Sequence, residues 1–132
     1  MEVKKKYIGL DDLEVYQLAR KLSAIGWQIY ESLSWQDKKT MGDQFIRSTD
    51  SVGANVAEGY GRYHYLDKIR FYYHSRGSYL ETKKHWLELL HDRKKIDDKV
   101  FQEYSEVGKK FEVKLNNFIT ATFNSKQKFD NE

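Results

Sequence analysis

Proline is absent from all 132 residues of the chain. Strands, turns and irregular loops normally use several prolines, whereas a few long helices need none, because proline breaks a helix interior. The sequence therefore predicts an all-α fold. Its length is that of one domain, and 39% hydrophobic residues with 15% aromatics suffice for a core built largely from rings. We predict a single domain over residues 1–132.

Apolar residues recur at spacings of three and four in four segments, which we expect to be helices. The expected helices cover residues 11–33, 37–58, 63–93 and 97–122, and the polar tail 123–132 is expected to fray. Short connections make an antiparallel up-and-down four-helix bundle the simplest topology.

Helix ends carry recognisable signals. Asp11 and Asp12 are good N-caps for the first helix, and Asp97-Asp98 starts the fourth. Ser34-Trp-Gln-Asp37 resembles a capping box with Asp in place of Glu. Gly59 and Gly61 are free to take positive φ, which predicts that they end the second helix.

Small residues are expected to let neighbouring helices approach closely. The second helix has Ser48, Ser51, Gly53, Ala54 and Ala57, and the third has Gly77. A glycine inside a helix costs on the order of 1 kcal/mol relative to alanine. We therefore expect close packing at Gly77 as the compensation.

Two runs of large residues at seven-residue spacing lie side by side in the third helix. The first run is Tyr65, Tyr72, Tyr79 and Trp86, and the second is Leu66, Tyr73, Leu80 and Leu87. Seven residues are close to two helical turns, so together the runs form an apolar face wider than an ordinary amphipathic stripe. Such a face suits a bundle helix that packs against its own chain and against another subunit. We predict a homo-oligomer with the first run as its candidate interface.

The charge balance points to no partner by itself, because 23 basic residues oppose 20 acidic ones for a net charge of +3. No apolar stretch is long enough to span a bilayer, and the basic start has no apolar core of a secretion signal. The zero cysteine count fits a reducing compartment weakly. We expect a cytoplasmic protein with no membrane association and no small-molecule substrate.

Five cations of the segment 60–99 are the candidate nucleic-acid-binding residues: Arg62, Arg70, Arg76, Lys83 and Lys84. Cations interleaved with aromatic rings suit single-stranded nucleic acid, because phosphates meet the cations and bases stack on the rings. In the simpler alternative the rings are core and interface while the cations reach out to water.

Glu88-Leu-Leu-His91 has the Glu-x-x-His spacing of di-iron bundles. A working centre needs that motif twice with two further carboxylates, and the sequence has no second copy. We therefore expect no metal, no cofactor and no catalytic residue, although a metal-dependent bundle enzyme stays as a remote alternative.

The stretch from Ser51 to Arg62 is the most specific in the chain. Asn55 and Glu58 are the polar residues in a run of small and apolar ones, and because they are three positions apart they lie on one side of a helix. Arg62 follows Glu58 by four positions, so the two side chains can form an ion pair if the helix continues that far. One interpretation is a polar clamp that fixes the turn between helices two and three; the other is a contact to a ligand or RNA.

With these residues in view, the sequence resembles the bacterial large-subunit (23S) ribosomal RNA intervening-sequence proteins over residues 10–122. The resemblance rests on residues 12–19, on the pattern S-x-x-A-N-x-A-E-G-x-G-R at residues 51–62 within the block 44–62, and on Arg76-Gly-Ser-Tyr-Leu-Glu81. The matching family-signature positions are Asn55, Glu58, Gly59, Arg62, Gly77, Ser78 and Glu81.

The resemblance implies an up-and-down bundle that assembles into a ring of five identical subunits, without an established activity. It also implies kinship with accessory bundle proteins of retroelements that bind reverse transcriptase and nucleic acid. A ring would repeat a weakly basic face several times, so RNA could bind through multivalency. The leading hypothesis is thus a non-enzymatic oligomeric binding or scaffold protein with RNA as partner; the alternative is an adaptor ring that binds only protein.

Overall fold

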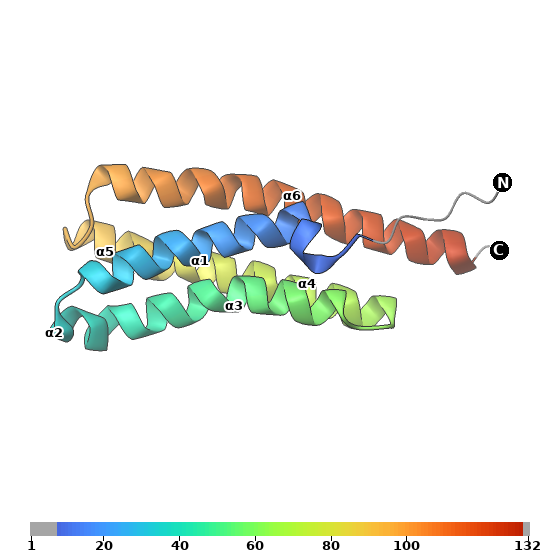
Figure 1. Cartoon of the computed structure of the whole chain (residues 1–132), viewed down its shortest axis with the longest axis horizontal. Helices are drawn as coiled ribbons and strands as arrows, with labels where there is room; N and C mark the ends of the chain where they lie inside the picture. Colours follow the sequence, from blue (N-terminus) through green and yellow to red (C-terminus); the bar gives the residue numbers. More distant parts are fainter. Residues whose placement is uncertain (1–7, 131–132) are drawn as a thin grey trace.

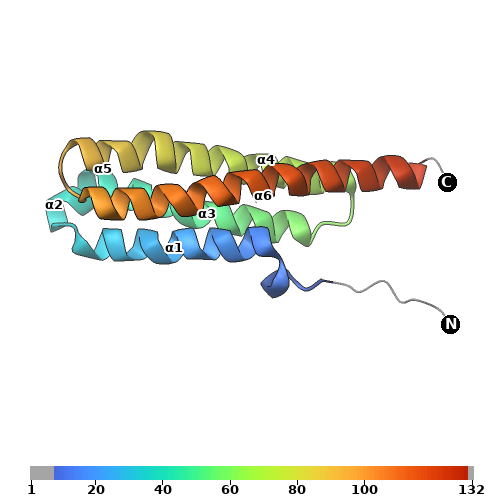
Figure 2. The ribbon, with the colours of Figure 1, turned by 90° about the horizontal axis from the view of Figure 1, so that it is seen from above.

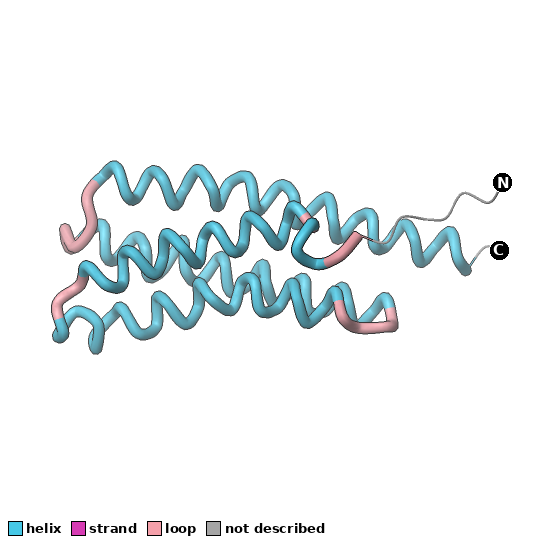
Figure 3. Tube along the Cα trace, in the orientation of Figure 1, coloured by secondary structure: helices cyan, strands magenta, loops and turns pink. Residues whose placement is uncertain are grey.

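The structure is a computed structural model that describes residues 8–130, with side chains described through Ser125. Its α-helices are α1 (Glu14–Ser32), α2 (Trp35–Asp37), α3 (Asp43–Tyr60), α4 (Tyr65–Leu80), α5 (Glu88–Asp92) and α6 (Asp98–Asp130). Two π-helical segments, Lys38–Gly42 and Glu81–Leu87, join α2 to α3 and α4 to α5 without a break. Four helical rods result, with loops only at their ends (Figure 3). The all-α prediction is confirmed.

The rods form the expected antiparallel up-and-down bundle (Figure 1). α1 contacts α3 and α6, and α4 also contacts α3 and α6, so α1 and α4 lie at diagonally opposite corners (Figure 2). The α1–α2 and α5–α6 connections share one end of the bundle, while the α3–α4 turn lies at the other, where α6 extends past it (Figure 1). No helix in the described part of the chain could cross a membrane.

The core takes large side chains from every rod. Its fully buried members include Leu22, Phe45, Val52, Leu87, Tyr104, Phe111 and Leu115. Three hydrogen bonds satisfy hydroxyls inside it: Thr49 pairs with Tyr104 at 2.9 Å, Thr82 donates to Ser48 at 2.7 Å, and Ser75 donates to the Val52 carbonyl at 2.7 Å. Among the described side chains no buried polar atom lacks a partner.

Of the three predicted N-caps, those at Ser34 and Asp97 are confirmed. The Ser34 hydroxyl accepts a 3.1 Å hydrogen bond from the Asp37 N–H, and the Asp97 carboxylate accepts one of 2.8 Å from the Val100 N–H. The prediction for Asp11 and Asp12 is wrong. Both lie in a 3-10 turn, Leu10–Asp12, and α1 follows Leu13 without a side-chain cap.

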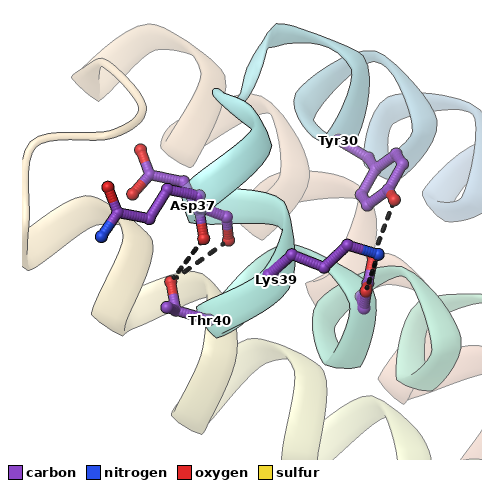
Figure 4. A network of polar contacts seen from close by, with 6 residues as sticks. Tyr30, Asp37, Lys39 and Thr40 are labelled. Atoms are coloured by element: carbon purple, nitrogen blue, oxygen red, sulfur yellow. Dashed lines mark hydrogen bonds and ion pairs between the residues drawn. The ribbon is translucent and has the colours of Figure 1, made fainter.

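The first connection between rods is held by polar contacts (Figure 4). The Tyr30 hydroxyl donates to the Asp43 carboxylate at 2.7 Å, and the Lys39 ammonium reaches the same carboxylate at 3.4 Å. The Tyr30 hydrogen bond lowers the pKa of Asp43 below its ordinary value. Thr40 donates to the Gln36 carbonyl at 3.2 Å, which ties the π-helical segment to α2.

The second helix does end in the predicted segment, with Gly61 as the C-cap of α3, but the expected positive φ is wrong. Within the described residues no glycine has a positive φ; α3 continues to Tyr60, and Gly61 has φ −79°. The left-handed residue is Lys94, with φ 58°, at the end of the third rod. There the Lys95 N–H bonds the Leu90 carbonyl at 2.8 Å, which closes the last turn.

Glycines do allow close approach, but at positions other than Gly77. A Cβ on Gly77 would meet no atom of the described chain within 4 Å, so the predicted close packing of Gly77 against another helix of its own bundle is wrong. A Cβ on Gly59 would lie 2.7 Å from Tyr72 Cε1, and one on Gly108 would lie 2.6 Å from Tyr79 Cε1. These two glycines admit tyrosine rings into the bundle.

The last helix is longer than expected. Its predicted end at residue 122 is wrong, because α6 extends to Asp130, whereas the fraying of the tail stays a prediction. Residues 123–130 contain neither glycine nor proline, so nothing in the sequence stops the helix. Asn131 and Glu132 lie outside the described residues.

Candidate functional site

The predicted oligomer interface needs correction at its centre. Tyr72 and Tyr79 are only 1% and 5% exposed in the single chain. The Tyr72 ring packs 4.9 Å from that of Phe118, and the Tyr79 ring 5.6 Å from that of Phe111, both on α6. Gly59 and Gly108 make the room for these rings, so Tyr72 and Tyr79 belong to the core.

The two ends of the same run, Tyr65 and Trp86, are half-buried. Trp86 packs against the core cluster, and its indole N–H donates to the Glu81 carboxylate at 2.8 Å. A role of Tyr65 and Trp86 at an interface stays a prediction.

The second run is the one that faces outward. Leu66 is 64% exposed, Tyr73 50% and Leu80 53%, whereas Leu87 is fully buried. The π-helical segment Glu81–Leu87 explains the difference, because its wider turns break the seven-residue register after Leu80. We call Leu66, Tyr73, Gly77 and Leu80 the α4 stripe; the intervals between them are seven, four and three residues, which places them on one side of the helix.

The α4 stripe combines exposed apolar side chains with an interior glycine. Gly77 is exposed and has no close neighbour in the described chain, so nothing within the chain offsets its helix penalty. A continuous exposed apolar strip is a feature of protein surfaces that bind another molecule.

The five candidate nucleic-acid-binding cations have partners within the chain. Lys83 and Lys84 both lie 3.7 Å from the Glu88 carboxylate. Arg76 donates a hydrogen bond to the Asn116 side chain of α6. These three cations are therefore not free charges.

Arg62 and Arg70 do come together, at the α3–α4 turn. Their guanidinium groups lie 4.8 and 5.5 Å from the centre of the Phe71 ring. Each is paired with a carboxylate, Arg62 with Glu58 at 2.5 Å and Arg70 with Asp67 at 3.4 Å. Exposed pairs of this kind contribute little to stability, so a phosphate could displace the carboxylates.

Tyr63 is the residue at this turn that the sequence analysis missed. It is 89% exposed and makes an edge contact with the His64 ring at 5.2 Å. The sequence predicts that the third helix starts at Tyr63, whereas α4 begins two residues later, at Tyr65, and leaves the Tyr63 ring in the turn.

The Glu58–Arg62 ion pair is confirmed, and it fits the polar-clamp interpretation. Arg62 joins the end of α3 to Phe71 of α4. Asn55 takes no part, because its amide donates to the Ser51 carbonyl at 2.9 Å. Of the other signature positions, Ser78 has its carbonyl oxygen 2.8 Å from the Thr82 hydroxyl, which shares its one proton between this carbonyl and Ser48.

Glu88 and His91 have separate partners. Glu88 faces its two lysines, whereas His91 hydrogen-bonds Asp98 at 2.7 Å and stacks on the Phe101 ring at 4.0 Å. Within the described residues no three His, Asp or Glu side chains are placed to hold a metal ion.

Comparison with known proteins agrees with this architecture. The family model described as 23S rRNA-intervening sequence protein matches residues 11–117. A solved structure of a protein of unknown function from the S23 ribosomal protein family, from Bacteroides thetaiotaomicron, superposes with a TM-score of 0.71 at 21% identity, covering 80% of this chain and 97% of that one. No curated protein matches.

Proposed function

The chain belongs to the family of 23S rRNA-intervening sequence proteins, and we propose that it is a non-enzymatic, oligomeric binding protein of the cytoplasm whose partner is RNA. The observation that carries the proposal is the α4 stripe. Three large apolar side chains lie on one side of this helix, and each is at least half exposed. Covering them with another surface removes apolar area from water, which is favourable. The resemblance noted in the sequence adds a ring of five as the expected assembly.

Assembly can be tested by charging the α4 stripe. Tyr73→Glu with Leu80→Glu should convert the oligomer to monomers, because burying two carboxylates at an interface is strongly unfavourable. Both residues are exposed, so the bundle should keep its helix content. Light scattering after size exclusion measures the mass, with Ala54→Glu on exposed α3 surface as the matched control. An unchanged mass in the stripe variant rejects this surface.

The RNA part of the proposal rests on the α3–α4 turn. Tyr63 offers an exposed ring, and Arg62 and Arg70 offer two guanidinium groups already oriented on Phe71. A base stacked on Tyr63 with its phosphate at an arginine is the arrangement common to proteins that bind single strands. An oligomer would repeat the site in each subunit and raise the affinity without further contacts.

A gel-shift titration with single-stranded and structured RNA at two salt concentrations tests this site. Tyr63→Ala should weaken binding, and Arg62→Gln should make the slope of log K against log salt shallower by about 0.7 per lost phosphate contact. Trp35→Ala, another exposed ring at 75%, lies at the opposite end of the bundle and serves as control. Binding that is insensitive to salt, or absent at low salt, rejects the RNA partner.

A protein-only adaptor is the second candidate, and the charge pairing favours it. Arg62, Arg70, Lys83 and Lys84 all face carboxylates within the chain, which reduces the positive field available to phosphates. A partner protein that stays bound after nuclease treatment would support this candidate over RNA.

A further inference from the structure

A groove follows the seam between α1 and α6. It consists of two adjoining hollows of about 460 and 260 Å3, which share Glu14 and Lys114. Leu18 and Val113 line the larger hollow, and Phe118 lines the smaller. We call this the α1–α6 groove; it is lined by residues 13–18 of the α1 side and residues 106–118 of α6. Val113 is 54% exposed, so an apolar side chain on the groove is left open to water.

The α6 side of the groove has unmatched positive charge. Lys109 and Lys110 have no hydrogen-bond or ion-pair partner among the described residues, while Lys114 lies 3.3 Å from the Glu14 carboxylate. The Lys114–Glu14 pair is exposed, so breaking it when another surface binds costs little free energy. Glu106 is the other acidic residue on the lining.

The α4 stripe has the complementary feature. Glu81 follows Leu80 directly and accepts a hydrogen bond from Trp86, but no cation of the described chain pairs with it. Of the cations on this side, Arg70 pairs with Asp67 and Lys84 with Glu88. Arg76 lies 5.0 Å from the centre of the Tyr73 ring and donates a hydrogen bond to the Asn116 side chain. At the Leu80 end of the strip the unpaired charge is thus the Glu81 carboxylate, whereas unpaired ammonium groups border the apolar groove.

We propose that the α4 stripe of one subunit docks into the α1–α6 groove of a second copy of the chain. This inference rests on the proposed oligomer and names its two surfaces. The stripe from Leu66 to Leu80 is about 21 Å long, and the groove from Glu106 to Phe118 is about 18 Å, at a rise of about 1.5 Å per residue. Gly77 leaves a gap in the stripe where the exposed Val113 side chain fits.

The positions of the two surfaces decide the symmetry of the assembly. α4 and α1 lie at opposite corners, so a chain cannot fill its own groove (Figure 2). Stripe and groove are different surfaces, so the contact is head-to-tail and leaves one free stripe and one free groove on every open chain of subunits. Such contacts close into a ring or continue as a filament, whereas a two-fold dimer uses the same surface twice.

Two variants that each remove one surface test the inference. Leu80→Glu removes the stripe and Val113→Glu removes the groove; the residues are 53% and 54% exposed, so both chains should fold, as circular dichroism will check. Each variant alone should be a monomer. An equimolar mixture should form a dimer and stop there, because the only intact stripe meets the only intact groove. Native mass spectrometry measures both results.

The outcomes separate this inference from the proposed function. A Val113→Glu chain that keeps the parental mass while Leu80→Glu dissociates overturns the groove but leaves the oligomer. Monomeric variants that do not combine on mixing overturn head-to-tail docking. An unmodified chain that is itself monomeric overturns both proposals.

Charge reversal gives a second, milder test. Glu81→Lys and Lys110→Glu should each weaken assembly, and the chain carrying both changes should regain it, because the pair is restored across the contact with opposite sign. Weakening by both single changes without recovery in the double variant contradicts the proposed pairing.

Discussion

Gly77→Ala is expected to stabilise the monomeric bundle. A Cβ at this position would meet no atom of the described chain within 4 Å, and Gly77 lies inside a helical rod that continues from Tyr65 to Asp92. The substitution therefore adds helix propensity without crowding, which is worth about 0.8–1 kcal/mol. For a chain of 132 residues that gain corresponds to a rise of roughly 3–5 °C in Tm.

Thermal unfolding followed by circular dichroism measures this change. It should be done in the Leu80→Glu background, so that assembly does not contribute to Tm. Gly59→Ala is the matched control of opposite sign. Its Cβ would lie 2.7 Å from Tyr72 Cε1 and 3.0 Å from the Lys68 carbonyl oxygen, and overpacking of this kind costs about 1–3 kcal/mol. A loss of stability in Gly77→Ala would refute the assignment of Gly77 to an open surface.

Three further results are expected. Burial raises the pKa of Tyr79 to about 12 and also raises the pKa values of Tyr72 and Tyr104, so stability should be constant below about pH 10 and fall as the pH rises beyond it, because only the unfolded chain ionises there. An ultraviolet titration should accordingly find that Tyr72, Tyr79 and Tyr104 ionise at higher pH than exposed tyrosines; ten tyrosines that titrate together would contradict their burial. Asp97→Ala should cost about 1 kcal/mol in urea unfolding through loss of the N-cap of α6, and no change would show that Val100 N–H needs no cap. Tyr104→Phe should cost about 1–3 kcal/mol because the buried Thr49 hydroxyl loses its partner, and adding Thr49→Val should recover part of that loss; additive losses would argue against the hydrogen bond.

Local signals predicted much of the fold. Four rods follow from apolar periodicity, and the caps at Ser34 and Asp97 depend on residues within three positions of them. The third rod was expected to end at residue 93, and α5 ends at Asp92. How it ends was not predictable, because Lys94 takes a left-handed conformation that glycine usually supplies.

The orientation of the third rod could not be read from its own sequence. Its two runs have the same spacing and differ by one position, which is about 100° of rotation on a helix. What buries Tyr72 and Tyr79 is the absence of side chains on other rods, at Gly59 and Gly108. The periodicity of α4 contains neither glycine, so the choice between the runs depends on tertiary packing.

In the candidate site, too, local contacts were predictable from the sequence and contacts between distant segments were not. The Glu58–Arg62 pair was predictable because it lies within one helical turn. The meeting of Arg62 and Arg70 on Phe71 depends on how α4 leaves the turn, and the α1–α6 groove depends on two rods that are distant in sequence. Pattern reasoning finds local pairs, whereas the path of the chain decides which surfaces they share.

The central claim is that another molecule of the same chain covers the α4 stripe. Because the sequence has no cysteine, Leu80→Cys places a single thiol in the stripe, and Ala54→Cys gives an exposed reference on α3. The measurement is the rate at which a maleimide labels each thiol. The account predicts slow labelling at position 80 in the assembled protein and labelling as fast as at position 54 once dilution separates the subunits. Equal rates in the undiluted protein would contradict it.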